Sequence, residues 1–98
     1  MTKAQIAVKI SKETGIQKVE VMASIEAFVT ILKETMIDGK NIYLRGFGTF
    51  FLKHKAAKTA RMINKNTTIW IPEHFTPAFR PAKTFRKKVE QSVPIKKK

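Results

Sequence analysis

The hydrophobic pattern of the chain changes at residues 44–50, at the midpoint of the sequence. Before this stretch, apolar residues recur at spacings of three and four, which is typical of amphipathic helices. After it, they alternate or occur among β-branched residues, as in strands. Within it, Gly46 and Gly48 flank Phe47. This predicts a tight turn or bulge, because glycine accepts positive φ and close approach of another backbone. A helical half followed by a strand half predicts an α+β fold.

Two helices are predicted before the turn. Thr2 and Gln5 have the spacing of a capping box and begin a helix over residues 3–13, which Gly15 ends. A second helix over residues 18–37 carries an apolar stripe, closed by Asp38-Gly39. The stripe consists of Val21, Ile25, Phe28, Val29, Leu32 and Met36. The two helices should form a hairpin with one shared apolar side, and we assign no chemistry to it.

Strands and a basic arm are predicted after residue 39. Strands are expected over residues 40–45, 49–55 and 67–71. Pro72 and Pro77 exclude a regular central strand on the return from the arm. A last helix over residues 81–91 should have Pro81 in its first turn. The chain is thus predicted to be a single domain. It divides into a helical body (1–39), a three-stranded antiparallel sheet with a short C-terminal helix (40–52 and 75–91), a long protruding β-hairpin arm (53–74) that turns at Asn64-Lys65-Asn66, and a basic tail (92–98).

The positive charge is confined to the second half. The chain has 20 Lys and Arg against 7 Asp and Glu, a formal net charge of +13. Residues 1–39 hold five of each sign, whereas residues 40–98 hold 15 bases and only Glu73 and Glu90, and so carry the whole +13. An excess confined to one half indicates a polyanion-binding surface. A solvated basic face without a ligand is the alternative.

Several other classes of function are disfavoured. There is no cysteine for a disulfide or thiolate metal site, and no apolar run of the length that a membrane span needs. We therefore expect a cytoplasmic protein without membrane contact. The acids are scattered without catalytic or metal-ligand spacing, so we expect no enzyme, no cofactor, no metal and no small-molecule substrate. His54 and His74 are expected to face one another across the hairpin, but two histidines alone make an incomplete metal site.

Three motifs together resemble the bacterial histone-like HU and integration host factor family of DNA-bending proteins. The first is the Gly-Phe-Gly-x-Phe signature, the second the basic arm with its Pro-x-Phe exit, and the third a late Lys-x-Phe-Arg helix. The residues that carry the resemblance are Gly46, Phe47, Gly48, Thr49 and Phe50; Lys55, Lys58, Thr59, Arg61, Ile69, Ile71, Pro77 and Phe79; and Lys83, Phe85 and Arg86. The pattern can be followed without gaps from about residue 2 to residue 90.

The resemblance implies an intertwined homodimer, or a heterodimer with a paralogue, whose arms embrace the minor groove of double-stranded DNA. Phe47, Phe50 and Phe79 would form an aromatic core at the dimer interface. DNA contacts would fall to Lys3, Lys18, Lys83 and Arg86 on the body, and to Lys53, Lys55, Lys58, Arg61, Ile63 and Lys65 on the arm. Such a protein would bend or compact DNA with little sequence specificity. A sequence-selective bender like integration host factor, or a basic RNA-binding module, is the alternative.

The chain departs from the family pattern at a few positions. Ile63 stands where the arm tip usually has a proline, and as an apolar residue it would still be the wedge inserted between base pairs, a known property of this family. Ala60, Asn66 and Ala82 replace common glycines. The tail adds three lysines, for which we predict a second, non-specific phosphate contact. Trp70 alternates with Ile69 and Ile71, so it either covers the hairpin or stacks on a sugar or base.

Replacing Ile63 with alanine tests the wedge. The Ile63→Ala variant should bend DNA less than the wild type, because alanine is too short to hold a base step open. Its thermal stability should be almost unchanged, since the residue lies at the predicted arm tip. Energy transfer between dyes on the two ends of a short duplex reports the bend, and equal transfer with both proteins would contradict the wedge role.

Overall fold

A computed structural model of the chain describes residues 1–62 and 67–95. The predicted turn at Asn64-Lys65-Asn66, the predicted wedge Ile63 and the three terminal lysines lie outside the described residues. The chain forms two compact units, Met1–Asp38 and Gly39–Lys98. Their boundary coincides with the predicted end of the helical half. That the whole chain is a single domain stays a prediction.

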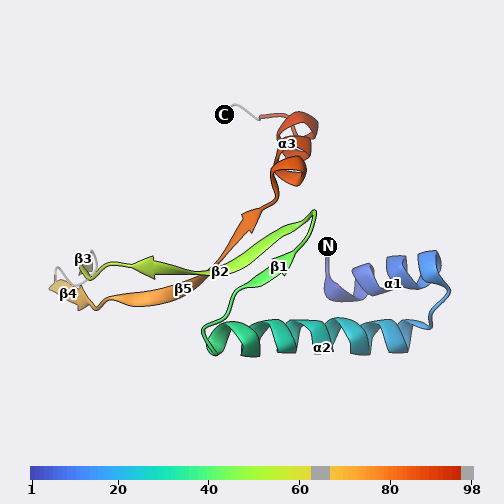
Figure 1. Ribbon diagram of the computed structural model, residues 1–98, viewed down its shortest axis with the longest axis horizontal. Helices are drawn as coiled ribbons and strands as arrows, with labels where there is room; N and C mark the ends of the chain where they lie inside the picture. The colour runs from blue at the N-terminus through green and yellow to red at the C-terminus, as the bar shows by residue number, and fades with distance from the viewer. Residues whose placement is uncertain (63–66, 96–98) are drawn as a thin grey trace. The chain divides into compact units, whose positions relative to one another are not determined.

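The first unit is the predicted helical hairpin (Figure 1). Its helices are α1 (Lys3–Thr14) and α2 (Lys18–Ile37), which run antiparallel. The capping box is confirmed, because the Gln5 backbone N–H donates to Thr2 Oγ1 at 3.3 Å and the Thr2 backbone N–H donates to Gln5 Oε1 at 2.8 Å. Gly15 ends α1 in the left-handed conformation, as predicted, at φ 79°.

The apolar stripe on α2 is only partly buried within one chain. The buried side chains of this unit are Ala7, Val21 and Met36. Phe28 of the stripe remains 49% exposed, and the neighbouring apolar residue Ile31, outside the stripe, is 61% exposed. Because exposed apolar side chains are disfavoured in water, a further surface that covered Phe28 and Ile31 would stabilise the hairpin.

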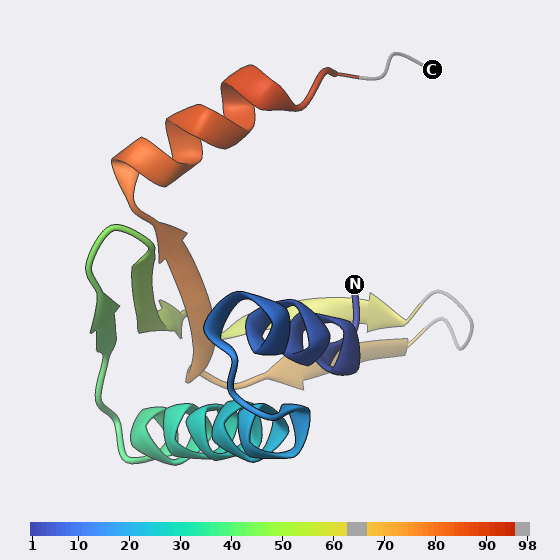
Figure 2. The same ribbon diagram turned by 90° about the vertical axis from the view of Figure 1, so that its right-hand side faces the viewer.

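The second unit holds two antiparallel sheets and a helix (Figures 1 and 2). The first sheet has strand order β1-β2-β5, built from β1 (Ile42–Leu44), β2 (Gly48–Lys55) and β5 (His74–Pro81). A two-stranded sheet of β3 (Lys58–Met62) and β4 (Thr67–Ile71) continues from it. The last element is α3 (Lys83–Ser92). Together with the first unit, these elements confirm the predicted α+β class.

The predicted glycine turn joins β1 to β2. The Phe47 N–H donates to the Leu44 carbonyl at 3.0 Å, and Gly46 has φ 82° at the third position of this turn, where a type II turn requires positive φ. At Gly48, a Cβ would lie 2.5 Å from the Arg80 carbonyl oxygen and 2.6 Å from the Phe79 ring. Glycine is therefore needed there for close packing of β2 against β5.

Two details of the prediction are wrong. The arm is not one continuous hairpin, because the strands are interrupted at residues 56–57 and 72–73, where Pro72 has no N–H to donate to a ladder. The last helix begins at Lys83, because Pro81 ends β5 opposite Gly48. The Ala82 N–H then donates to the Phe47 carbonyl at 2.8 Å, which holds the chain extended before the helix. Pro77 does lie in an edge strand, which agrees with its exclusion from a central one.

The close contact at Gly48 predicts a selective loss of stability. Gly48→Ala should lower the free energy of unfolding by about 3 kcal/mol, because the new methyl group meets backbone and a packed ring. Gly46→Ala is the matched control, since a Cβ there meets nothing within 4 Å. It should cost only the strain of the left-handed conformation, about 1 kcal/mol. Denaturant unfolding at equal protein concentration measures both, and equal losses would contradict the packing argument.

Candidate nucleic-acid interface

The pleat of the three-stranded sheet separates two chemically different faces. Side chains alternate along a strand, and directly paired residues of antiparallel strands lie on the same face. The pairing of Phe50 with Phe79 therefore defines one face, and the pairing of Thr49 with Arg80 defines the other. We call the first the aromatic face and the second the basic face.

The aromatic face brings together the three phenylalanines predicted for the dimer core. The ring centroids of Phe47 and Phe79 are 4.9 Å apart, and so are those of Phe50 and Phe79. Phe85 of α3 joins them, with its ring 5.3 Å from that of Phe47. Sequence reasoning did not place Phe85 in this group, although its position early in the last helix was a signal. Phe47 is still 42% exposed, so the cluster is incomplete in a single chain.

The basic face carries two of the predicted DNA-binding lysines. Lys53 and Lys55 alternate along β2 on the same side as Thr49, and both are exposed. On the neighbouring strand, Arg80 lies with its guanidinium carbon 4.6 Å from the centroid of the Phe51 ring. This cation–π contact holds the charge over the face while leaving its donors available to an anion.

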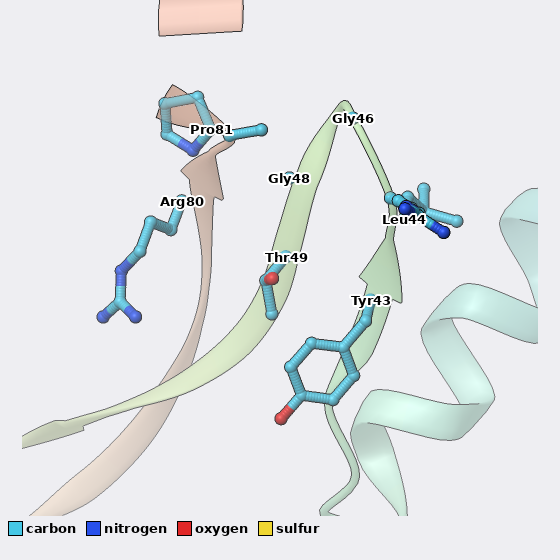
Figure 3. Close-up of a pocket in the computed structure, with 9 residues that line it drawn as sticks. Tyr43, Leu44, Gly46, Gly48, Thr49, Arg80 and Pro81 are labelled. Atoms are coloured by element: carbon cyan, nitrogen blue, oxygen red, sulfur yellow. The ribbon is translucent and has the colours of Figure 1, made fainter. Parts of the chain in front are cut away.

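An open pocket of about 420 Å³ lies at the end of the sheet near the glycine turn. Figure 3 shows Tyr43, Thr49 and Arg80 there, one from each of the three strands. Arg45, from the turn, also lines it. Sequence reasoning missed Arg45 and Arg80 as site residues. The signal that could have found Arg80 is the strand register, because pairing Phe50 with Phe79 places Arg80 opposite Thr49.

The arm carries the next predicted contacts. Lys58 and Arg61 both belong to β3, where they pair with Ile71 and Thr68. Since they are three residues apart in a strand, they lie on opposite faces of the ribbon. The predicted contacts Ile63 and Lys65 lie outside the described residues.

The remaining predicted cations lie on helices. Lys3 and Lys18 are exposed on the first unit, and Lys83 and Arg86 are exposed on α3. Lys3 Nζ is 3.1 Å from Glu26 Oε1, and Arg86 Nε is 3.6 Å from Glu90 Oε1. Exposed ion pairs contribute at most about 1 kcal/mol each, so a phosphate group can displace either carboxylate.

The expectation that the two histidines face one another is wrong. His54 pairs with Phe75 and His74 pairs with Lys55, so the histidines lie on opposite faces of the sheet. His54 Nε2 is 3.1 Å from Glu73 Oε2 instead, and its ring lies 5.4 Å from that of Phe75. Within residues 1–62 and 67–95, no three His, Cys, Asp or Glu residues gather as a metal site would require. No helix in the same residues is long and apolar enough to cross a membrane.

Comparisons with known proteins agree on one family. The family described as bacterial DNA-binding protein matches residues 1–90. Integration host factor subunit beta of Marinobacter nauticus is 33% identical over 94 residues, 95% of this chain and 96% of the relative. DNA-binding protein HU of Thermus thermophilus is 32% identical over 91 residues, 93% of this chain and 94% of the relative. The structure of Anabaena HU in a cocrystal with DNA matches with a TM-score of 0.85 at 28% identity, and the match covers 96% of this chain and 100% of the HU chain.

The ion pair of Lys3 predicts a gain of DNA affinity on its removal. Glu26→Gln should raise affinity for duplex DNA about twofold to threefold at low salt, because Lys3 then need not break its ion pair with Glu26 before it contacts a phosphate. Glu34→Gln removes the same charge from the same helix without touching that pair, so it corrects for the change in net charge. Fluorescence anisotropy of a labelled duplex measures both variants, and equal affinities for them would argue against a Lys3 contact.

Proposed function

Because the chain belongs to the bacterial DNA-binding protein family that includes HU and integration host factor, we propose that its basic face and arm bind the phosphates and minor groove of DNA. Its function is that of an architectural protein that binds double-stranded DNA and bends it as a dimer. The observation that carries the proposal for its own residues is the strand register, which places the cations of the basic face on the side of the sheet opposite the Phe50–Phe79 pair.

The basic face supplies the electrostatic part of binding. Lys53 and Lys55 follow one another on this face of β2, and Arg80 lies on the same face of β5, opposite Thr49. Each cation that neutralises a phosphate releases a condensed counterion, so the affinity falls as salt rises. Contacts of this kind position the duplex without reading its sequence.

The arm supplies the groove contact. A two-stranded ribbon is narrow enough to enter a DNA groove, and β3 and β4 form such a ribbon with Lys58 and Arg61 on its two faces. Members of this family are known to use the minor groove, insert apolar wedges and kink the duplex. We assign the wedge to Ile63 from its place in the sequence.

The aromatic face and the exposed apolar residues of α2 supply the dimer interface. Phe47 and Phe79 remain partly exposed in one chain, as do Phe28 and Ile31. A second copy of this chain, or a paralogue, would cover both surfaces. Phe47, Phe50 and Phe79, with Phe85, are the residues that we place at the centre of this interface.

The proposed mechanism contains no chemical step. It requires binding, insertion and bending alone, and the minor groove offers a degenerate code, so sequence preference should follow the deformability of the DNA. We place the protein on the bacterial nucleoid in the cytoplasm. Sequence-selective binding of the kind associated with integration host factor is not favoured by any particular residue of this site.

A salt titration of DNA binding tests the proposal. The double variant Lys53→Ala/Lys55→Ala should flatten the slope of log affinity against log salt by about 1.8, since each lost phosphate contact is worth about 0.9. Lys9→Ala/Lys12→Ala is the matched control, because it removes the same charge from α1. Equal slopes for the two double variants would contradict a specific role of the basic face.

The same titration identifies the partner. Duplex DNA with a nick should bind more tightly than intact duplex of equal length, because a nick lowers the cost of bending. Duplex RNA of that length should bind more weakly than both DNAs. Equal or tighter binding to the RNA would contradict double-stranded DNA as the partner.

A further inference from the structure

The arm carries a large aromatic side chain, Trp70, that belongs neither to the aromatic face nor to the basic face of the three-stranded sheet. Trp70 is the central residue of β4 and pairs with Thr59 of β3. Its surface is 66% exposed. A tryptophan that covered the hairpin would have lost most of its exposure, so the structure favours the alternative, contact with something outside the chain.

The neighbours of Trp70 indicate what that contact is. Side chains alternate between the two faces along each strand. The Thr59–Trp70 pair therefore lies on the same face of the ribbon as the Arg61–Thr68 pair, two residues further along β3. This face therefore surrounds an indole with two hydroxyls and a guanidinium. These polar groups are donors suited to phosphate oxygens, whereas the indole offers an apolar surface.

The charge of the ribbon restricts the partner to a polyanion. Residues 58–61 and 67–71 contain Lys58 and Arg61 and no acidic residue. In a nucleic acid the apolar surface that alternates with phosphates along the backbone is the sugar. An indole with phosphate-binding groups on either side matches that alternation, because the walls of a DNA groove consist of sugars joined by phosphates.

We propose that Trp70 packs its indole against a deoxyribose in the wall of the minor groove and so anchors the arm on DNA. The contact rests on the proposed function, because it requires the arm to lie along a duplex. It is apolar, so it adds affinity without neutralising a phosphate. Trp70 thus differs in kind from the lysines and arginines of the arm.

The fluorescence of the protein tests this contact directly, because Trp70 is its only tryptophan. Binding of a saturating 30-base-pair duplex should reduce quenching of Trp70 by acrylamide at least twofold. Inorganic polyphosphate serves as the control probe, because it is a polyanion without sugars or bases, and it should leave the quenching nearly unchanged. Equal protection by polyphosphate, or none by DNA, would overturn the sugar contact.

A variant separates the contact from electrostatics. Trp70→Thr should weaken binding of the duplex about fivefold to tenfold, the range expected for loss of one aromatic contact to nucleic acid, and should leave the salt slope as it is. Trp70→Phe should restore most of the affinity. Ile69→Thr changes the neighbouring residue on the other face of β4, so it is the control for a loss of strand structure. Circular dichroism verifies the fold of each variant. An unchanged affinity for Trp70→Thr, or a loss shared by Ile69→Thr, would overturn the proposal.

Failure of this inference can be told apart from failure of the proposed function. Steep, salt-dependent binding of DNA by the wild type with Trp70 still open to acrylamide would overturn the sugar contact alone. Absence of salt-dependent DNA binding by the wild type would overturn the proposed function and the contact that rests on it.

Discussion

The packing of Phe50 against Phe79 is the interaction on which the rest of this structure depends. It sets the register of β2 against β5, and a slip of one residue would turn every side chain of a strand to the other face. The same register turns Thr49 and Arg80 to the opposite side. One aromatic contact thus separates the surface that we propose as the dimer interface from the surface that we propose to bind DNA phosphates.

The parts of the fold that depend on local chemistry could be predicted from the sequence. The second helix agrees with its prediction over residues 18–37, because its apolar period, Asp38 and Gly39 all act within the helix or next to it. The first residue of α3 could not be predicted, because it depends on a hydrogen bond from Ala82 to Phe47, far away in the sequence. The same reason applies to Arg80, whose place on the basic face depends on pairing with a strand about thirty residues earlier.

The contributions to binding divide by their response to salt. In the proposed function, the cations of the basic face and of the helices would act through counterion release. Two of them, Lys3 and Arg86, are already paired with a carboxylate that a phosphate can displace. Trp70, by contrast, presents an apolar surface on the arm. A protein with both kinds of contact can hold DNA loosely through phosphates and more firmly where the arm fits the groove.

The most direct test of the account compares a new positive charge on each face of one strand. Thr76 and Phe75 are neighbours in β5, but Thr76 lies on the basic face opposite Lys53 and Phe75 lies on the other face opposite His54. The account predicts that Thr76→Lys steepens the salt dependence of DNA binding by about 0.9, the value of one added phosphate contact, and that Phe75→Lys leaves the slope unchanged. Equal steepening by the two variants would contradict the separation of functions between the faces.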